Sequence, residues 1–154
     1  MVLVMKIGII SDTHGRLSGK VLELFSGVEA IFHAGDIGSP KVIDALEELA
    51  PVYAVRGNMD YGPIATRFPR KEFVELDDLF FHIIHEPHLL DIDPAAAGID
   101  CVIFGHTHEP YCKEKDGVLF INPGSASLPR YGQSPSVACC TIDRKIITPK
   151  IYPL

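Results

Sequence analysis

Short apolar runs, rich in β-branched and aromatic residues, recur along the chain between polar and glycine-containing segments. Runs of this length and composition are typical of strands buried in a sheet. They predict strands at 6–10, 30–34, 51–55, 80–84, 101–104 and 118–122. Each run is therefore expected to form a buried strand.

Helical patterns lie between the first three predicted strands. Apolar residues at helical spacing run from Leu17 to Phe25, and a second pattern begins after Ser39, a candidate N-cap, with Pro40 at the first helical position. Strands that alternate with helices are typical of βαβ units and a mostly parallel sheet. A shorter third helix is expected at 88–97, weakened by Pro94.

The last third of the chain has a different pattern, in which one predicted strand follows another with only turns between them. It runs from CVIFGHTH through GVLFINPGS to PSVACCTID and KIITPKIY. Such a succession favours a second, more antiparallel sheet. The two patterns together predict an α/β fold, and the length of 154 residues predicts a single domain over 1–154.

The composition bears on which binding partners and which cellular compartment are expected. A formal net charge of −6, without a cluster of lysine and arginine, argues against a stable nucleic-acid complex. We expect no leader and no membrane segment, and the start of the chain is either Met1 or Met5. Four cysteines lack the C-x-x-C spacing of zinc sites, so reduced thiols in a cytoplasmic protein are expected. They are Cys101, Cys112, Cys139 and Cys140.

Polar side chains gather directly after the predicted strands. In chain order they are Asp12 and His14, Asp36, Asn58, His85, and finally His106 and His108. Ligands of open α/β sheets bind in the crevice beyond the carboxyl ends of the strands. The topology is therefore expected to bring these seven side chains together.

These oxygen and nitrogen donors are too many for one tetrahedral zinc ion, and they include no thiolate. Two ions fit better if one carboxylate bridges them, as two-metal hydrolytic sites require. Asp36 is the expected bridge. Asn58 would offer its carbonyl oxygen to an ion and its amide hydrogen to a bound anion.

The order of DTH, GD, GN, a later histidine and GHTH resembles that of the calcineurin-like metallophosphoesterases. The short length, together with GNMD and INPGSASLPR, is similar to the small YfcE-type phosphodiesterases of bacteria and archaea. The resemblance covers almost the whole chain. It implies a four-layer αββα sandwich with a dinuclear site at its top.

The resemblance also implies how the ions are held. Asp12, His14, Asp36 and His108 would hold one ion, and Asp36, Asn58, His85 and His106 the other. Manganese is the ion that the resemblance implies, although the donors would equally accept iron, zinc, cobalt or nickel. The implied reaction is the in-line attack of a metal-bridging hydroxide on the phosphorus of a small phosphate ester.

Asn58 and Asp36 are thus the candidate catalytic residues. Asn58 is also a candidate substrate ligand, with Ser125 and Arg130 of the loop NPGSASLPR, because guanidinium groups match phosphate geometry. A plain turn at Pro123 and Gly124 is an equally good interpretation of that loop.

Two departures from the family pattern bear on the substrate. Relatives continue the fourth-strand histidine with Gly and His, whereas this chain reads HEPH, so His88 is displaced by one position. Larger relatives have a histidine after the GN asparagine that can act as general acid, and Met59 stands here. Without that acid a poor leaving group is harder to protonate, so a diester or an activated ester is expected.

Several alternatives stay open at this stage. Strand-end Asp and Asn residues also form plain turns, and Asp60 either closes a turn or orients a ligand histidine. Arg56 either reaches the site or forms a salt bridge on its rim. His33 and His82, inside apolar strands, are expected to be ordinary core or surface histidines.

An interaction module on the same fold, similar to the retromer scaffold subunit, is the second function class. Loss of Asn58 or of the histidine at 85 would favour such a module, and this chain keeps both. That completeness favours the enzyme. An exposed apolar patch would suffice to form a homo-oligomer.

Overall fold

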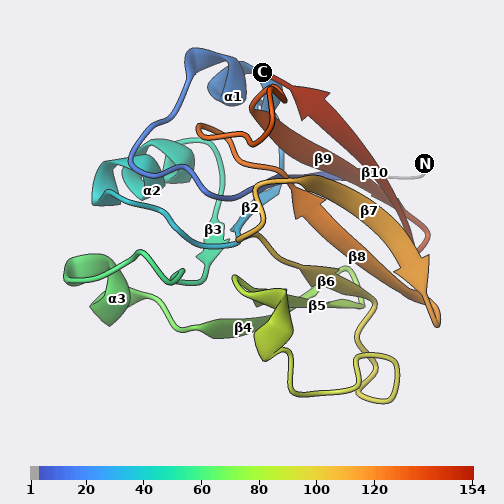
Figure 1. Cartoon of the computed structure of the whole chain (residues 1–154). Helices are drawn as coiled ribbons and strands as arrows, with labels where there is room; N and C mark the ends of the chain where they lie inside the picture. The colour runs from blue at the N-terminus through green and yellow to red at the C-terminus, as the bar shows by residue number, and fades with distance from the viewer. Residues whose placement is uncertain (1–3) are drawn as a thin grey trace.

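The computed structural model describes residues 4–154 and contains two five-stranded sheets of mixed direction, packed face to face. The first sheet has the order β10-β9-β1-β2-β3 and the second the order β4-β5-β6-β8-β7 (Figure 1). The expected two-sheet sandwich is therefore confirmed. The candidate start at Met1 lies outside the described residues.

The first sheet combines parallel strands from the N-terminal βαβ units with a C-terminal hairpin. Its strands are β1 (Met5–Ile10), β2 (Ala30–His33), β3 (Val52–Ala54), β9 (Ser136–Asp143) and β10 (Ile146–Pro153). The strand β1 pairs in parallel with β2 and antiparallel with β9. The prediction that the whole last third builds a second sheet is thus wrong for β9 and β10. The strand β9 pairs with β1 and β10 pairs with β9, so the two ends of the chain meet in one sheet, which no local pattern reveals.

The second sheet is built around a parallel core of three strands. Its strands are β4 (Lys71–Leu76), β5 (Leu79–Ile84), β6 (Cys101–Ile103), β7 (Pro110–Lys115) and β8 (Val118–Pro123). The strands β5, β6 and β8 are parallel neighbours, and β4 and β7 add antiparallel edges. The edge strand β4 was not predicted, because charged residues interrupt its apolar positions.

Two helices lie beside the first sheet, α1 (Gly19–Leu24) and α2 (Pro40–Glu47) (Figure 1). The helix α2 begins as predicted, since the Ser39 hydroxyl accepts a hydrogen bond from the Lys41 amide and Pro40 occupies the first turn. A further helix, α3 (Pro63–Arg67), was not predicted. None of the helices in the described part of the chain has the length and apolar character needed to cross a membrane.

The predicted helix at 88–97 is not formed, and a single 3-10 turn, η1 (Pro87–Leu89), is present instead. The Asp93 carboxylate accepts a hydrogen bond from the amide of Ala95, which closes a turn around Pro94. Aspartate and proline favour such turns over a continuing helix, because the side chain competes for backbone donors and proline lacks one.

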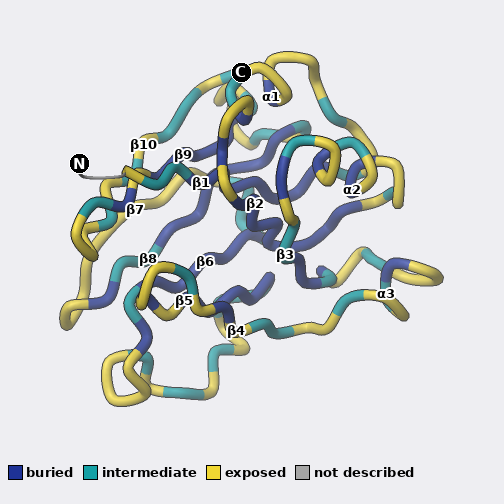
Figure 2. Tube along the Cα trace, turned by 180° about the vertical axis from the view of Figure 1, so that it is seen from behind, coloured by how far each residue is buried: buried dark blue, intermediate teal, exposed yellow. Residues whose placement is uncertain are grey.

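One hydrophobic core cluster lies between the two sheets and is shared by both. Its members include Ile9 and Phe32 of the first sheet and Phe81, Ile83 and Ile103 of the second. Figure 2 shows the buried segments gathered on the strands, with exposed segments at the loops. Burial of this apolar surface holds the sheets face to face. The carboxyl ends of β1, β2, β5 and β6 are thereby fixed next to one another.

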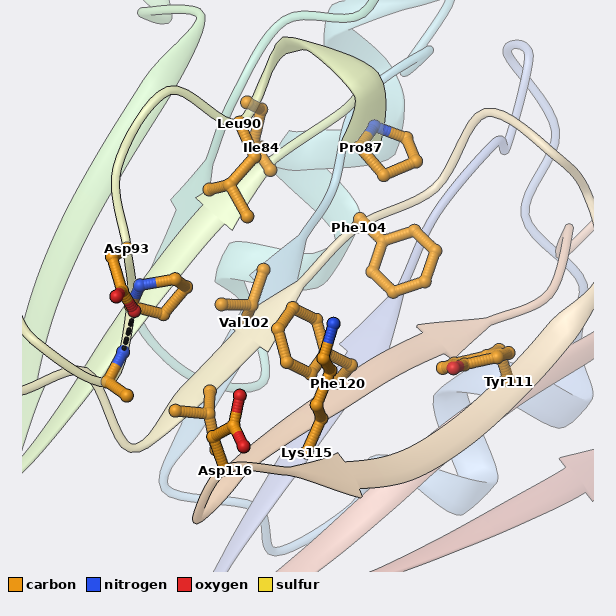
Figure 3. A pocket seen from close by; sticks show the side chains of 13 residues that line it. Ile84, Pro87, Leu90, Asp93, Val102, Phe104, Tyr111, Lys115, Asp116 and Phe120 are labelled. Atoms are coloured by element: carbon orange, nitrogen blue, oxygen red, sulfur yellow. Dashed lines mark hydrogen bonds between the residues drawn. The ribbon is translucent and has the colours of Figure 1, made fainter.

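The outer face of the second sheet is only thinly covered. An open cavity of about 530 Å³ lies between the segment after η1 and the strands of this sheet. Figure 3 shows Ile84, Val102, Phe104 and Phe120 on its sheet side, with Pro87 and Leu90 above them. The turn at Asp93 stands where a helix was expected over 88–97.

Candidate metal centre

The predicted ligands meet at the carboxyl ends of strands from both sheets. The loop after β1 runs beside the loop after β2, since the Asp12 amide lies 2.9 Å from the Gly35 carbonyl and the His14 amide 3.0 Å from the Asp36 carbonyl. The second sheet reaches the same place, because the amide of His106 donates to the Asp12 carboxylate at 3.1 Å. The backbone thus places these side chains around one space.

The backbone turns sharply at most of these residues. Asp12, His14, Asp36, His106 and His108 all have positive φ angles, between 47° and 73°. Side chains other than glycine rarely adopt this left-handed conformation, and it persists only where the surroundings impose it. Its recurrence at five candidate ligands indicates that each strand end is bent to aim a polar side chain inward.

Glycine precedes three of the candidate ligands because no other side chain fits there. A Cβ on Gly57 would lie 2.1 Å from an Asp36 carboxylate oxygen, and one on Gly105 would lie 2.1 Å from the Ser11 hydroxyl and 2.7 Å from the Asp12 carboxylate. Such approaches are far shorter than van der Waals contact. The GN and GH motifs therefore allow the backbone to approach the carboxylates closely.

One group of donors comprises Asp12, His14 and His108. The Asp12 Oδ1 atom lies 3.2 Å from His108 Nε2 and 3.8 Å from His14 Nε2, and the two imidazole nitrogens are 3.4 Å apart. Donor atoms at these spacings surround a space of the size that a divalent ion occupies at metal–ligand distances of about 2.1 Å.

A second group comprises Asp12, Asp36 and His85. The His85 Nε2 atom lies 3.2 Å from Asp36 Oδ2 and 2.9 Å from Asn58 Oδ1, and His106 Nδ1 lies 3.2 Å from the same Asn58 oxygen. The structure thus brings all seven predicted donors together. Both carboxylates lie between the two groups, because Asp36 Oδ2 is also 3.9 Å from His14 Nε2.

Hydrogen bonds to backbone carbonyls fix the orientation of two of the histidines. His85 Nδ1 donates to the Ala34 carbonyl at 2.8 Å, and His108 Nδ1 donates to the Leu128 carbonyl at 2.6 Å. In a neutral imidazole this leaves the Nε2 lone pair directed at the carboxylates. Metal-binding histidines are held in this manner, with the second ring nitrogen bonded to an acceptor.

Asp12 has a buried carboxylate oxygen without a hydrogen-bond partner, and this oxygen indicates whether the centre fits an ion. Asp12 is fully buried, its Oδ2 accepts from Ser11 and His106, and its Oδ1 has no hydrogen-bond partner. A buried acceptor without a donor is costly, and cation coordination removes that cost. Because Oδ1 faces the histidine nitrogens, the donors fit divalent transition metals that accept both oxygen and imidazole.

Mutual electrostatics shift the pKa values of the central groups. Burial alone would raise the pKa of Asp36, but the His85 imidazole and the Met59 amide outweigh it, so the pKa lies below its usual value. Burial likewise opposes protonation of His85, yet Asp36 and Asp12 raise its pKa. The adjacent Asp12 carboxylate raises the pKa of His108. The histidines beside the carboxylates thus favour protons in the place that an ion would take.

Buried polar residues that the sequence reasoning did not single out support the donor loops. Thr13 lies 3.0 Å from His33 Nε2 and donates to the Ile37 carbonyl, and the Gly35 amide donates to His33 Nδ1. Burial lowers the pKa of His33 to about 4, so this ring is neutral, as expected for a core histidine. The position of Thr13 between two candidate ligands in the DTH motif was the signal that could have identified it.

Asp60 closes a turn and contacts no histidine. Its carboxylate accepts hydrogen bonds from the amides of Ile37, Gly38 and Gly57, at 3.0, 3.0 and 2.9 Å. It therefore ties the loop that carries Asp36 to the loop that carries Asn58.

The two weaker substrate candidates lie in different surroundings. Ser125 is buried, and its hydroxyl donates to the Asp12 carbonyl and accepts from the Leu128 amide, both at 2.8 Å. These hydrogen bonds connect Ser125 to the backbone of Asp12 and to the loop that contacts His108. Arg130 is exposed, and its charge offsets part of the rise in the pKa of His108.

The HEPH segment forms a small polar cluster beside the centre. His88 Nε2 lies 3.4 Å from a Glu86 carboxylate oxygen, and the His88 and His106 ring centroids are 5.8 Å apart. Glu86, His88 and His106 thus adjoin the second group of donors. His88 itself is exposed to solvent.

Comparison with known proteins agrees with this geometry. The model of the calcineurin-like phosphoesterase superfamily domain matches residues 5–145. The chain belongs to this superfamily. Curated relatives of this phosphoesterase include a phosphodiesterase of Methanocaldococcus jannaschii, 40% identical over 78% of this chain and 83% of the relative. The phosphodiesterase YfcE of Escherichia coli is 32% identical over 86% of this chain and 85% of the relative.

Solved structures resemble this phosphoesterase over nearly its whole length. An archaeal phosphodiesterase superposes with a TM-score of 0.81 at 34% identity, covering 97% of this chain and 100% of the other. Vps29 of Entamoeba histolytica, solved with zinc, superposes with a TM-score of 0.69 at 18% identity, covering 97% and 99%. The second likeness shows the shared fold alone.

Proposed function

We propose that this phosphoesterase is a metal-dependent phosphodiesterase with two divalent ions at the described centre. The observation that carries the proposal is the pair of carboxylates, Asp12 and Asp36, facing imidazole nitrogens from both sheets at 3.2 to 3.9 Å. Relatives at 32% and 40% identity are named phosphodiesterases. Manganese is the proposed ion, and iron, zinc, cobalt and nickel suit the same donors.

The donors divide between the ions as the resemblance implies. Asp12, His14 and His108 belong to one ion and Asn58, His85 and His106 to the other. Asp36 is proposed as the bridge, because its Oδ2 faces a histidine of each set while its Oδ1 is held by the Met59 amide at 2.9 Å. When bound, the ions would supply a hydroxide near neutral pH and neutralise charge on the phosphoryl group.

The residues of this chain would bind and orient the ester. Asn58 is exposed at the mouth of the centre, and its carbonyl oxygen faces His85 and His106. Its amide nitrogen is then available to donate to a phosphoryl oxygen. Arg130, whose charge acts on His108, is a second proposed contact with the anion.

The leaving group must depart with little help from an acid. At the position after Asn58, Met59 is 59% exposed and offers no proton. Phosphodiesters with a good leaving group are therefore the favoured substrates, since their departure depends least on general acid catalysis.

The proposal is tested with metal-stripped protein that is resupplied in turn with Mn²⁺, Ni²⁺, Co²⁺, Zn²⁺ and Mg²⁺. Hydrolysis of bis(p-nitrophenyl) phosphate is compared with that of p-nitrophenyl phosphate, and Asn58→Ala is measured beside the wild type. We expect metal-restored turnover that favours the diester and is lost in Asn58→Ala. Two bound ions per chain without turnover on either ester would instead favour the interaction module.

A further inference from the structure

A small hollow beside the metal centre is lined by three cations. Arg56, Arg70 and Lys71 surround it together with His85 and Glu86. The register of β4 and β5 ends with Lys71 paired to Ile84, and Arg70 and His85, the residues just beyond this pair, line the same hollow. The Arg56 amide lies 2.9 Å from the Pro69 carbonyl, which brings the third cation to the same edge.

The arginines of this cluster differ from its lysine in their pairing. Lys71 forms an ion pair with Asp91 at 2.7 Å. Arg56 donates to the Ala65 carbonyl, which leaves its charge uncompensated. Within residues 4–154, neither Arg56 nor Arg70 forms an ion pair with a carboxylate. Two guanidinium groups without a carboxylate ion pair thus stand beside a single lining carboxylate, Glu86, in a chain of net charge −6.

We propose that Arg56 and Arg70 form an anion subsite that receives a second negative group of the substrate, beside the ester that is cleaved. This inference rests on the proposed phosphodiesterase activity and narrows its substrate to esters with an additional phosphate or carboxylate. Guanidinium groups bind such anions through paired, charge-assisted hydrogen bonds. Arg70 is exposed and Arg56 half-buried, so the subsite opens to solvent where a long substrate would extend.

The subsite lies close enough to act on the same substrate molecule. His85 belongs both to the hollow and to the second group of donors. Arg56 stands two positions before Asn58, the proposed contact for the phosphoryl group. A substrate whose ester is held at Asn58 therefore needs only a short extension to place a second anion against the guanidinium groups.

The test compares two substrates that differ only in the second anion. These are thymidine 5′-(p-nitrophenyl phosphate) and the same ester with a 3′-phosphate. We expect kcat/KM to be roughly tenfold or more higher for the phosphorylated ester, since a charge-assisted contact has about this strength. Arg70→Gln should abolish this ratio, and Arg70→Lys should restore part of it because the charge returns.

Arg144→Gln serves as the matched control. Arg144 follows β9 at the end where Ile142 pairs with Met5, opposite the end of β1 that leads to the centre. The same loss of charge at this remote position should leave the substrate ratio unchanged. The wild-type ratio should also fall as salt increases, because screening weakens contacts between exposed charges. Equal ratios in Arg144→Gln and Arg70→Gln would overturn the subsite.

A binding measurement separates this inference from the proposed activity. Thymidine 3′,5′-bisphosphate and thymidine 5′-phosphate are titrated into the metal-loaded protein by calorimetry, with wild type and Arg70→Gln compared. Tighter binding of the bisphosphate that is lost in the variant supports the subsite even without turnover. Equal affinity for both ligands, with bis(p-nitrophenyl) phosphate still hydrolysed, overturns the subsite and leaves the phosphodiesterase intact.

Discussion

His85 Nε2 lies 3.2 Å from Asp36 Oδ2, and this contact joins the two sheets of the sandwich. Asp36 follows β2 in the first sheet, whereas His85 follows β5 in the second. An ion held between them exists only when the sheets are packed together. Metal binding should therefore stabilise the folded chain, because the unfolded chain lacks the site.

The proposed bridge gives the first prediction. Asp36→Ala should lose both ions, whereas His14→Ala should retain one of them, because Asp36 is the proposed bridge and His14 is assigned to one ion alone. Since altering even a supporting residue costs about 10–100-fold in metal affinity, we expect a loss of at least about a hundredfold for the bridge. The number of ions per chain, measured by mass spectrometry of the metals after dialysis, provides the comparison. Equal stoichiometry in the two variants would remove the bridge from Asp36.

The close approach at Gly57 gives the second prediction. Gly57→Ala places a Cβ 2.1 Å from an Asp36 oxygen, so the carboxylate must shift and the affinity for metal should fall. Gly19→Ala is the control, because a Cβ there meets nothing within 4 Å. Calorimetric titration with Mn²⁺ checks both variants. Wild-type affinity in Gly57→Ala would mean that the loop relaxes without moving Asp36.

Asp60 supports the third prediction. Asp60→Ala removes the acceptor of three backbone hydrogen bonds and should lower the free energy of unfolding by about 2 kcal/mol. Asp60→Asn keeps one carbonyl acceptor, so its free energy of unfolding should lie between those of Asp60→Ala and the wild type. Turnover in both variants should decrease only in part, because Asp60 contacts no candidate metal ligand. Urea denaturation and steady-state kinetics measure the two effects, and a complete loss of activity in folded Asp60→Asn would contradict this role.

The raised pKa values of His85 and His108 give the fourth prediction. Because these rings hold protons above their usual pH range in the metal-free protein, ions must displace protons. The apparent metal affinity should fall by roughly tenfold or more for each pH unit below neutrality. Titrations in buffers of different ionisation enthalpy count the protons released. No proton release near pH 6 would show that both rings are already neutral there.

His33 gives the fifth prediction, which concerns acid stability. Its pKa is lowered from 6.5 to about 4, so the folded chain keeps it neutral while the unfolded chain takes up a proton. The contribution of neutral His33 to the free energy of unfolding is therefore complete above about pH 6.5 and is lost as the pH falls towards 4. The loss amounts to about 3 kcal/mol.

Urea denaturation of the metal-free protein at pH 7 and pH 4.5 measures the His33 effect. His33→Gln should be less stable than the wild type at pH 7 but should lose less stability between the two values. An identical pH dependence in both proteins would assign the acid sensitivity to other groups.

The candidate site was largely predictable because its residues mark the ends of strands. A buried run that stops at a polar pair, as at Asp12 and His14, is visible in the sequence, and the carboxyl ends of parallel strands meet by topology. The supporting contacts were not predictable. The Asp60 carboxylate contacts Ile37 and Gly38, on another loop, and the Ser125 hydroxyl contacts Asp12 across the sandwich.

The sequence by itself determined the apolar strands, the helix start at Ser39 and the order of the metal-binding motifs, because periodicity, capping and turn chemistry are local. Only the tertiary structure decided that β9 and β10 complete the first sheet, that a turn at Asp93 replaces a helix, and that Arg70 and His85 line one hollow. These features depend on pairing between segments distant in the chain or on hydrogen bonds that compete with a local preference. Such terms are settled by the whole fold, because the free energy of each contact depends on what packs around it.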